Sequence, residues 1–283
     1  MKKITLQGGN PPVILAFGAL DPSGCGGIQA DIETSASLGC HCAPVVTALC
    51  MEGGISSAET FAVESAVIIE QARSILEGMN VSAIKVGFLG SNHNIEAVHT
   101  ILRDFCDIPV VSHPALSLWD SEDCEQQNFS NVFSELILPD TRIANFSLFE
   151  ARQISREADT LNAVAQAIMS VGPGLALITG TGQETHAFQN SLYSESGLLK
   201  NYHWSQEPLS CHGSSSTLAT SQAAYLAHGS DEISAIEQAL NFTWRAVSAS
   251  RELGFGKRTP HRFFWADKNI ETPSDLPVSP KNH

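Results

Sequence analysis

Residues 13–39 read VILAFGALDPSGCGGIQADIETSASLG, and this stretch contains the repeating unit of the fold. An apolar run at 13–19 is followed by a Pro-Ser-Gly turn and then by a helical pattern that ends at Gly39. Similar apolar runs recur along the chain at 43–50, 83–90, 108–115, 141–147 and 175–182. Strands that alternate with helices in this way are typical of βαβ units. The sequence therefore predicts an α/β fold with a mostly parallel central sheet flanked by helices on both faces.

Most segments between and after these runs have a helical pattern, and one segment has a strand pattern instead. Helices are expected near 26–38, 64–79, 93–105, 148–154, 159–171, 214–228 and 231–252. The segment 187–204 differs, because FQNSLYSESGLLKNYHW reads as two strands around a Ser-Gly turn. We therefore expect a β-hairpin at the edge of the sheet. Residues 1–270 are expected to form a single domain, and the Pro- and Ser-rich end at 271–283 is expected to be a flexible tail.

Charge and cysteine content restrict the class of protein. The chain has 283 residues and a formal net charge of −14, which disfavours nucleic-acid binding through a broad basic surface. Its seven cysteines are scattered without a C-x-x-C pair, so neither a disulfide framework nor a zinc site is indicated. The N-terminus lacks the apolar core of a signal peptide, and no apolar run has membrane-spanning length. These features predict a cytoplasmic protein without a membrane partner.

Ligands of parallel open sheets bind outside the carboxyl ends of the strands, so the loops there carry the functional signal. The stretch CHGSSSTLATS at 211–221 precedes a helical pattern and offers backbone N–H groups and hydroxyls suited to an anion. A serine N-cap with a flexible lead-in is the alternative. The loop at 20–26 matches neither the P-loop nor the complete G-x-G-x-x-G pattern, so a tight turn without a ligand also stays open.

Four stretches together resemble the hydroxymethylpyrimidine and phosphomethylpyrimidine kinases of thiamine biosynthesis, members of the ribokinase-like superfamily. The stretches, in chain order, are DPSGCGGIQADIETSASLGCHCAPVVTAL (21–49), IKVGFLGS (84–91), LPDTRIANFSLFEA (138–151) and HGSSSTLATSQAAYLAHG (212–229). The resemblance implies a ribokinase-like fold and ATP-dependent phosphorylation of hydroxymethylpyrimidine or its monophosphate, with Mg²⁺ as the second cofactor.

The resemblance also implies a pocket for the pyrimidine ring. Asp31 matches an acidic residue that contacts the pyrimidine in the family. Glu52 stands where the family has a glutamine, and an ionised carboxylate there would favour a ring edge rich in N–H donors. Phe88 matches an apolar wall residue and could stack on a flat ring, or it could be an ordinary core residue.

The catalytic positions of the family are altered in this chain. Its anion hole reads G-T-G-C, with the cysteine as the proposed base, and the matching residues are Gly213, Ser214, Ser215 and Ser216. Backbone N–H groups there could stabilise a transferring phosphoryl group. A neutral serine hydroxyl is a poor base without an activating neighbour. His212 is the nearest candidate neighbour, although a surface or capping role is the alternative.

Three further positions of the nucleotide and phosphate region also bear on the reaction. Thr179 replaces a lysine of the family's K-G-G-H pattern, and His113 replaces the aspartate of its V-D-P pattern. Glu150 matches the glutamate of the T-P-N-L-P-E signature and is the candidate outer ligand to Mg²⁺. Loss of a base, a lysine and an aspartate together suggests a weakened kinase.

Three hypotheses about function follow. The chain is a kinase of a hydroxymethylpyrimidine, a catalytically weakened relative that binds a pyrimidine-like ligand in a regulatory role, or a kinase of a pyridoxine-like ring alcohol. Each predicts a small-molecule ring partner, and the kinases also require a nucleotide. A homodimer is compatible with all three.

Overall fold

The computed structural model describes residues 9–51, 60–116, 124–155, 158–182, 188–204, 209–254 and 258–267. Within these ranges nine strands form one sheet in the order β3-β2-β1-β4-β5-β6-β7-β8-β9. The neighbouring strands from β2 through β7 are parallel, whereas β3, β8 and β9 pair antiparallel with their neighbours. The strands are β1 Val13–Leu20, β2 His41–Cys50, β3 Thr60–Ala62, β4 Val81–Val86, β5 Val110–Ser112, β6 Ile143–Ser147, β7 Leu175–Thr179, β8 Phe188–Ser194 and β9 Gly197–Trp204.

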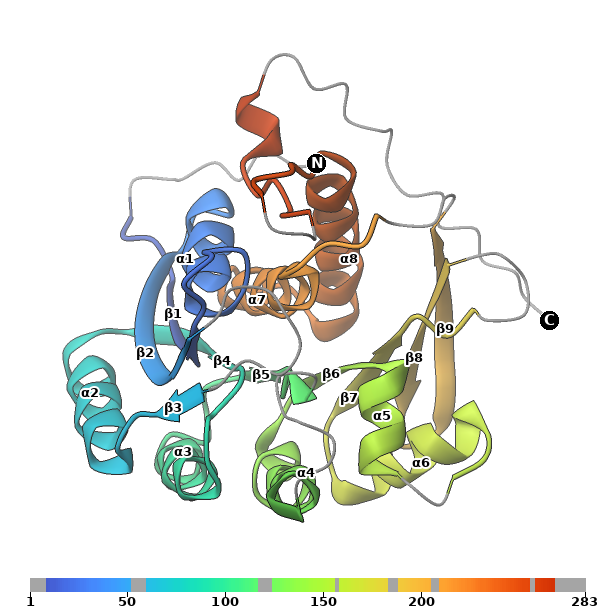
Figure 1. Cartoon of the computed structure of the whole chain (residues 1–283), viewed down its shortest axis with the longest axis horizontal. Helices are drawn as coiled ribbons and strands as arrows, with labels where there is room; N and C mark the ends of the chain where they lie inside the picture. Colours follow the sequence, from blue (N-terminus) through green and yellow to red (C-terminus); the bar gives the residue numbers. More distant parts are fainter. Residues whose placement is uncertain are drawn as a thin grey trace.

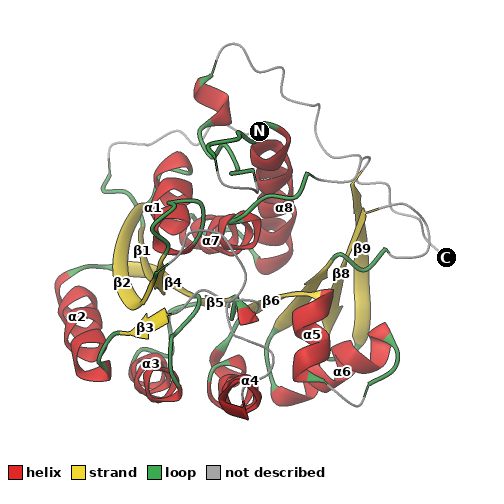
Figure 2. Cartoon of the chain, in the orientation of Figure 1, coloured by secondary structure: helices red, strands yellow, loops and turns green. Residues whose placement is uncertain are grey.

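Helices cover both faces of the sheet, as Figures 1 and 2 show. In the orientation of Figure 1, α1, α7 and α8 lie above the sheet and α2 to α6 lie below it. The helices are α1 Gly27–Ser37, α2 Ser65–Gly78, α3 Asn92–Asp104, α4 Cys124–Leu136, α5 Leu148–Ile154, α6 Leu161–Val171, α7 Ser214–Ala227 and α8 Glu232–Ser248, with short 3-10 helices at Leu138–Asp140 and Phe264–Ala266.

The apolar core is divided by the sheet into two large clusters. One contains Ile68 of α2, Ile95 of α3 and Phe133 of α4, packed below the sheet. The other contains Leu218 of α7 and Ile236 of α8, packed above it. Strands buried on both faces read as continuous apolar runs, which explains why VILAFGAL of β1 is so apolar.

The structure confirms the predicted α/β class and the edge hairpin. The six predicted strands correspond to β1, β2, β4, β5, β6 and β7, and the segment 187–204 contains the antiparallel pair β8 and β9. Strand β3 and helix α4 were not predicted, and α8 ends at Ser248 rather than near 252. The single domain over 1–270 stays a prediction, and the expected tail at 271–283 lies outside the described residues.

No described helix combines the length and the apolarity that a membrane span requires.

Candidate active site

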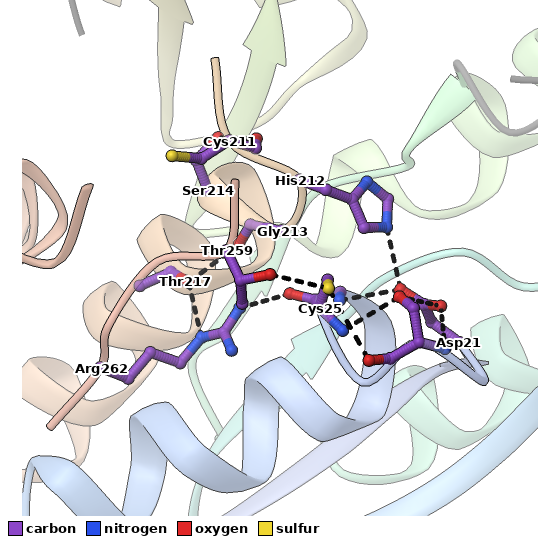
Figure 3. A network of polar contacts seen from close by, with 11 residues as sticks. Asp21, Cys25, Cys211, His212, Gly213, Ser214, Thr217, Thr259 and Arg262 are labelled. Carbon is purple, nitrogen blue, oxygen red and sulfur yellow. Dashed lines mark hydrogen bonds and ion pairs between the residues drawn. The ribbon is translucent and has the colours of Figure 1, made fainter. Parts of the chain in front are cut away.

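The loop after β1 and the start of α7 are in direct contact (Figure 3). Gly213 precedes α7 and has a left-handed backbone conformation, with φ of 86°. A Cβ atom on Gly213 would lie 1.9 Å from the carbonyl oxygen of Cys25, which belongs to the loop after β1. Because a side chain would be disfavoured by the backbone conformation and blocked by this carbonyl, the contact requires glycine at position 213.

Asp21 organises the loop at 21–26. Its Oδ1 atom accepts hydrogen bonds from the backbone N–H and the hydroxyl of Ser23, at 2.8 and 2.7 Å, and its Oδ2 atom accepts from Gly26 N at 2.9 Å. His212 Nε2 lies 2.9 Å from the same Oδ2 atom. Burial alone would raise the pKa of Asp21, but the hydrogen bonds from His212, Ser23 and Gly26 outweigh it and hold that pKa well below its usual range.

The first turn of α7 presents backbone N–H groups ahead of the helical hydrogen-bond ladder. The first bond of that ladder runs from Thr217 N to Gly213 O at 3.0 Å, so the N–H groups of residues 214–216 have no partner within the helix. The side chains of Ser214, Ser215 and Ser216 are half-buried. Such an N-terminus is suited to an anion, because unpaired N–H groups and the helix dipole both favour negative charge. Phosphate binding by these residues stays a prediction.

Asp31 forms a buried ion pair beneath this region. Its Oδ2 atom lies 2.9 Å from Lys85 Nζ of β4, and its Oδ1 atom accepts a hydrogen bond from Thr220 of α7 at 2.7 Å. Asp31 and Lys85 are almost completely inaccessible to solvent. Both oxygens of Asp31 therefore have partners within the protein, and its role as a ring contact stays a prediction.

Phe88 and Glu52, the other two predicted ring contacts, have different outcomes. Phe88 is buried in a small apolar cluster with Ala19 and Ala48, after the carboxyl end of β4, and its ring centroid lies 6.2 Å from that of Phe129. The position is compatible with a wall of a ring pocket and with ordinary packing. Glu52 lies outside the described residues.

His113 and Glu150 come together at the carboxyl ends of β5 and β6. Ser147 and Glu150 form a capping box at the start of α5, and Glu150 Oε1 accepts a hydrogen bond from Leu116 N at 2.9 Å. His113 Nε2 lies 3.7 Å from Glu150 Oε2. Burial opposes ionisation of Glu150, but the charge and hydrogen bond of His113 and the donors of Ser147 hold the pKa of Glu150 below its usual range.

Both oxygens of Glu150, the candidate outer Mg²⁺ ligand, accept hydrogen bonds from the protein. Glu150 Oε2 accepts from both the N–H and the hydroxyl of Ser147 at 2.8 Å, while Oε1 is occupied by Leu116. Within the described ranges no group of three or more His, Cys, Asp or Glu side chains could hold a metal ion. The role of Glu150 as an outer ligand to Mg²⁺ stays a prediction.

Thr179 ends β7 beside the last residue of β6. It pairs with Ser147 in the parallel ladder, and its hydroxyl donates to Phe146 O at 3.3 Å. His113, Glu150 and Thr179 therefore lie at the carboxyl ends of three adjacent strands, β5, β6 and β7. Open α/β sheets bind ligands at the carboxyl ends of their strands.

Sequence reasoning missed three polar features of the candidate active site. Asp21 had a local signal, because Asp-Pro-Ser-Gly is a turn sequence in which the aspartate caps following N–H groups. The buried amides of Asn145 and Gln222 exchange two hydrogen bonds, of 2.7 and 2.9 Å, and join β6 to α7. Arg262 is buried against the loop at 21–26 and the first turns of α7 (Figure 3). The last two features had no local signal, because their partners are distant in the sequence.

Comparison with protein families identifies relatives over most of the chain. A family model described as phosphomethylpyrimidine kinase matches residues 21–261. The hydroxymethylpyrimidine/phosphomethylpyrimidine kinase of Streptomyces coelicolor is 28% identical, with 87% of this chain and 92% of that protein covered. The corresponding kinase of Rhizobium meliloti is 26% identical, with 90% and 99% covered.

A plant relative is longer. The chloroplastic thiamine biosynthetic bifunctional enzyme of Arabidopsis thaliana is 27% identical over 94% of this chain, but the match covers 54% of the plant protein. The chain thus spans about half the length of that relative.

Solved structures share the fold. The ADP complex of Bacillus subtilis pyridoxal kinase has a TM-score of 0.81 and 24% identity, and covers 91% of this chain and 100% of that one. The phosphomethylpyrimidine kinase of Clostridium difficile has a TM-score of 0.66 and 21% identity, and covers 81% and 96%. At these identities the likeness establishes the arrangement of the sheet and helices.

Proposed function

The chain belongs to the phosphomethylpyrimidine kinase family, and on this basis we propose that it transfers a phosphoryl group from ATP to hydroxymethylpyrimidine, to its monophosphate, or to both. The observation that carries the proposal is the contact of Gly213 with the loop at 21–26. That contact places the N–H groups of residues 214–216, which have no partner within the helix, next to the loop that follows β1. Phosphoryl transfer asks a protein mainly for positioning and for stabilisation of charge on the phosphate oxygens.

The first turn of α7 supplies that charge stabilisation in the proposal. The N–H groups of residues 214–216 precede the helical ladder and converge at the positive end of the helix dipole. Fixed backbone donors need no reorganisation when negative charge develops. Gly213 allows the adjacent loop to approach without a side chain in between.

Proton removal from the substrate hydroxyl is the weaker part of the machinery. Ser216 stands at the end of this turn, and a serine hydroxyl does not ionise near neutral pH without help. His212, the nearest candidate activator, already has its Nε2 atom at 2.9 Å from Asp21. Slow turnover with retained positioning is therefore the expected behaviour.

The nucleotide is proposed to bind at the carboxyl ends of β5, β6 and β7, next to α7. His113, Glu150 and Thr179 lie at these three strand ends. The Bacillus subtilis structure of the same fold is an ADP complex, which supports a nucleotide partner. Mg²⁺ would accompany the phosphates of ATP, since this small ion often keeps water and phosphate ligands rather than a protein cage.

Two alternative functions are each supported by a particular observation. The serine at 216, the threonine at 179 and the histidine at 113 favour a weakened relative that binds a ring without efficient turnover. The pyridoxal kinases share the fold at 20–24% identity, which does not distinguish a pyridoxine-like ring from a pyrimidine.

Isothermal titration calorimetry separates these functions. Hydroxymethylpyrimidine, pyridoxal and MgATP are titrated separately into the purified protein. Binding of both hydroxymethylpyrimidine and MgATP supports the proposal. Binding of the pyrimidine without any MgATP binding supports the weakened relative, and binding of pyridoxal with no response to hydroxymethylpyrimidine would refute the assigned substrate.

A further inference from the structure

A segment near the end of the described chain, residues 258–266, packs across the elements that carry the candidate active site. Its backbone is anchored at two points close to Arg262. His261 N donates to Ala246 O of α8 at 2.9 Å, and the Ser37 hydroxyl of α1 donates to Arg262 O at 2.6 Å. These anchors direct the Arg262 side chain into the protein, where its exposed fraction is 0%.

The guanidinium of Arg262 binds three separate parts of the chain, and Figure 3 shows two of these contacts, with Thr217 and Cys25. Its Nε atom donates to Thr217 Oγ1 in the first turns of α7, at 3.0 Å. Its Nη2 atom donates to the carbonyl oxygen of Cys25 in the loop after β1. Its Nη1 atom donates to Glu33 Oε2 of α1 at 2.9 Å. One planar side chain therefore joins α1, the loop at 21–26 and α7.

Two of these three contacts converge on Gly213. The Thr217 hydroxyl that accepts from Arg262 also donates to Gly213 O at 2.8 Å. The Cys25 carbonyl that Arg262 binds is the atom that a Cβ on Gly213 would meet at 1.9 Å, and Nη2 itself would lie 2.8 Å from that Cβ. Arg262 thus holds both sides of the contact that places the start of α7 against the loop.

Charge attraction to a substrate is a poor explanation for this arginine. Its side chain is inaccessible, and Glu33 lies 2.9 Å away and offsets its charge. A buried arginine with a fork of fixed donors acts best by holding its partners in one geometry.

We propose that Arg262 is a positioning residue for phosphoryl transfer, which fixes the loop at 21–26 and the first turn of α7 at the separation that the phosphate requires. The proposal rests on the function proposed above for this site. It extends that function to a residue that does not touch the substrate.

The test compares Arg262→Lys with Arg251→Gln as the matched control. Lysine keeps the positive charge but has no fork that could reach three partners. Arg251 belongs to the same region and contacts His261 Nε2 and Asp267, and none of its described contacts reaches α7 or the loop at 21–26. Two quantities are measured for each protein: kcat and KM for hydroxymethylpyrimidine with MgATP, and the rise in melting temperature caused by inorganic phosphate.

We expect Arg262→Lys to lower kcat by about 10- to 100-fold with a much smaller change in KM, because small misplacements of a reacting group have effects of that size. The stabilisation by phosphate should also be lost, while Arg251→Gln should match the wild type in both measurements. Thr217→Val provides a second route if Arg262→Lys does not fold, since it removes the hydroxyl that joins Arg262 to Gly213 O. It should have the same two effects.

The outcomes separate this inference from the proposed function. A wild type that does not phosphorylate the pyrimidine but is stabilised by phosphate contradicts the proposed function, and loss of that stabilisation in Arg262→Lys still supports the positioning role. Folded Arg262→Lys and Thr217→Val proteins with wild-type kcat and wild-type phosphate response would overturn the inference. A wild type with neither turnover nor a phosphate response contradicts both.

Discussion

His212 Nε2 lies 2.9 Å from Asp21 Oδ2, and this contact joins the residue before Gly213 to the first residue of the loop after β1. The two residues are separated by 191 positions in the sequence. Together with Arg262 on the other side of Gly213, the pair fixes the loop against α7 (Figure 3). The position of the loop against α7 therefore depends on contacts between residues that are distant in the sequence.

The Asp21 carboxylate should make the stability of the protein depend on pH. Its pKa is lowered in the folded state, so its contribution is fully present above the unfolded value of about 3.9 and is lost as the pH falls through the folded value. Asp21→Asn should therefore be less stable than wild type at pH 7, and the difference should shrink below about pH 4. Urea unfolding of both proteins from pH 7 to pH 3 measures the difference in their unfolding free energies. The two proteins have all other titratable groups in common. A difference that stays constant over this range would argue against an ionised Asp21 as the source.

Glycine at 213 should be far less replaceable than glycine at 229. Gly213 and Gly229 have nearly the same positive φ, 86° and 85°, but only at Gly213 would a Cβ meet another atom, whereas Gly229 has nothing within 4 Å. Gly229→Ala should cost about 1–2 kcal/mol for the left-handed backbone alone. Gly213→Ala should cost clearly more and should also abolish stabilisation by phosphate, because the Cys25 carbonyl must move. Equal unfolding free energies for the two variants would show that the close contact is not required.

The buried pair of Asp31 and Lys85 should be strongly coupled. Lys85→Met leaves the Asp31 carboxylate with Thr220 as its remaining described partner and should lower the unfolding free energy by about 3–5 kcal/mol. The double variant Asp31→Asn with Lys85→Met should regain a large part of this loss, since no uncompensated charge remains. A double-mutant cycle by urea unfolding at pH 7 measures the coupling, and additive effects of the two changes would contradict it.

The predicted ring contact of Asp31 can be examined separately. A folded Asp31→Ala protein should bind hydroxymethylpyrimidine more weakly by about 1–3 kcal/mol, the usual effect of a lost charged hydrogen bond. Calorimetry gives this value directly. Unchanged affinity would restrict Asp31 to its ion pair with Lys85.

A protein that has kept the phosphate site but lost a strong base should respond to a cysteine at position 216. Ser216→Cys should increase formation of phosphorylated pyrimidine, because a thiol at a helix N-terminus ionises far more readily than a hydroxyl. Ser216→Ala should have little effect. Product formation by the three proteins under the same conditions decides this, and robust wild-type activity that collapses in Ser216→Ala would show that the serine is itself essential.

The sheet and its edge hairpin could be predicted because the apolar runs and turn residues are local signals. Strand β3 has only three residues, Thr60–Ala62, too few for a periodic pattern. Helix α4 had a usable signal, since Phe129, Val132, Phe133 and Leu136 follow helical spacing and the two phenylalanines are buried in the core. The polar residues around these four obscured the pattern.

The candidate site could be predicted only in part, for a physical reason. Gly213 and the three serines after it are consecutive and suggest a helix N-terminus, and in the structure Gly213 is the N-cap of α7 and the serines form its first turn. The contacts that hold this turn come from Asp21 and Arg262, and their partners lie far away along the chain. Only the folded sheet and helices bring such residues together, so no local pattern indicates them.

We expect this chain to phosphorylate a hydroxymethylpyrimidine. The most direct test incubates the purified protein with MgATP and hydroxymethylpyrimidine or its monophosphate, and measures the phosphorylated product by mass spectrometry, with Gly213→Ala as the negative control. The wild type should form product slowly, Gly213→Ala should form none above background, and Ser216→Cys should form it faster. Absence of product from either substrate in both the wild type and Ser216→Cys, in protein that is folded and binds MgATP, would contradict it.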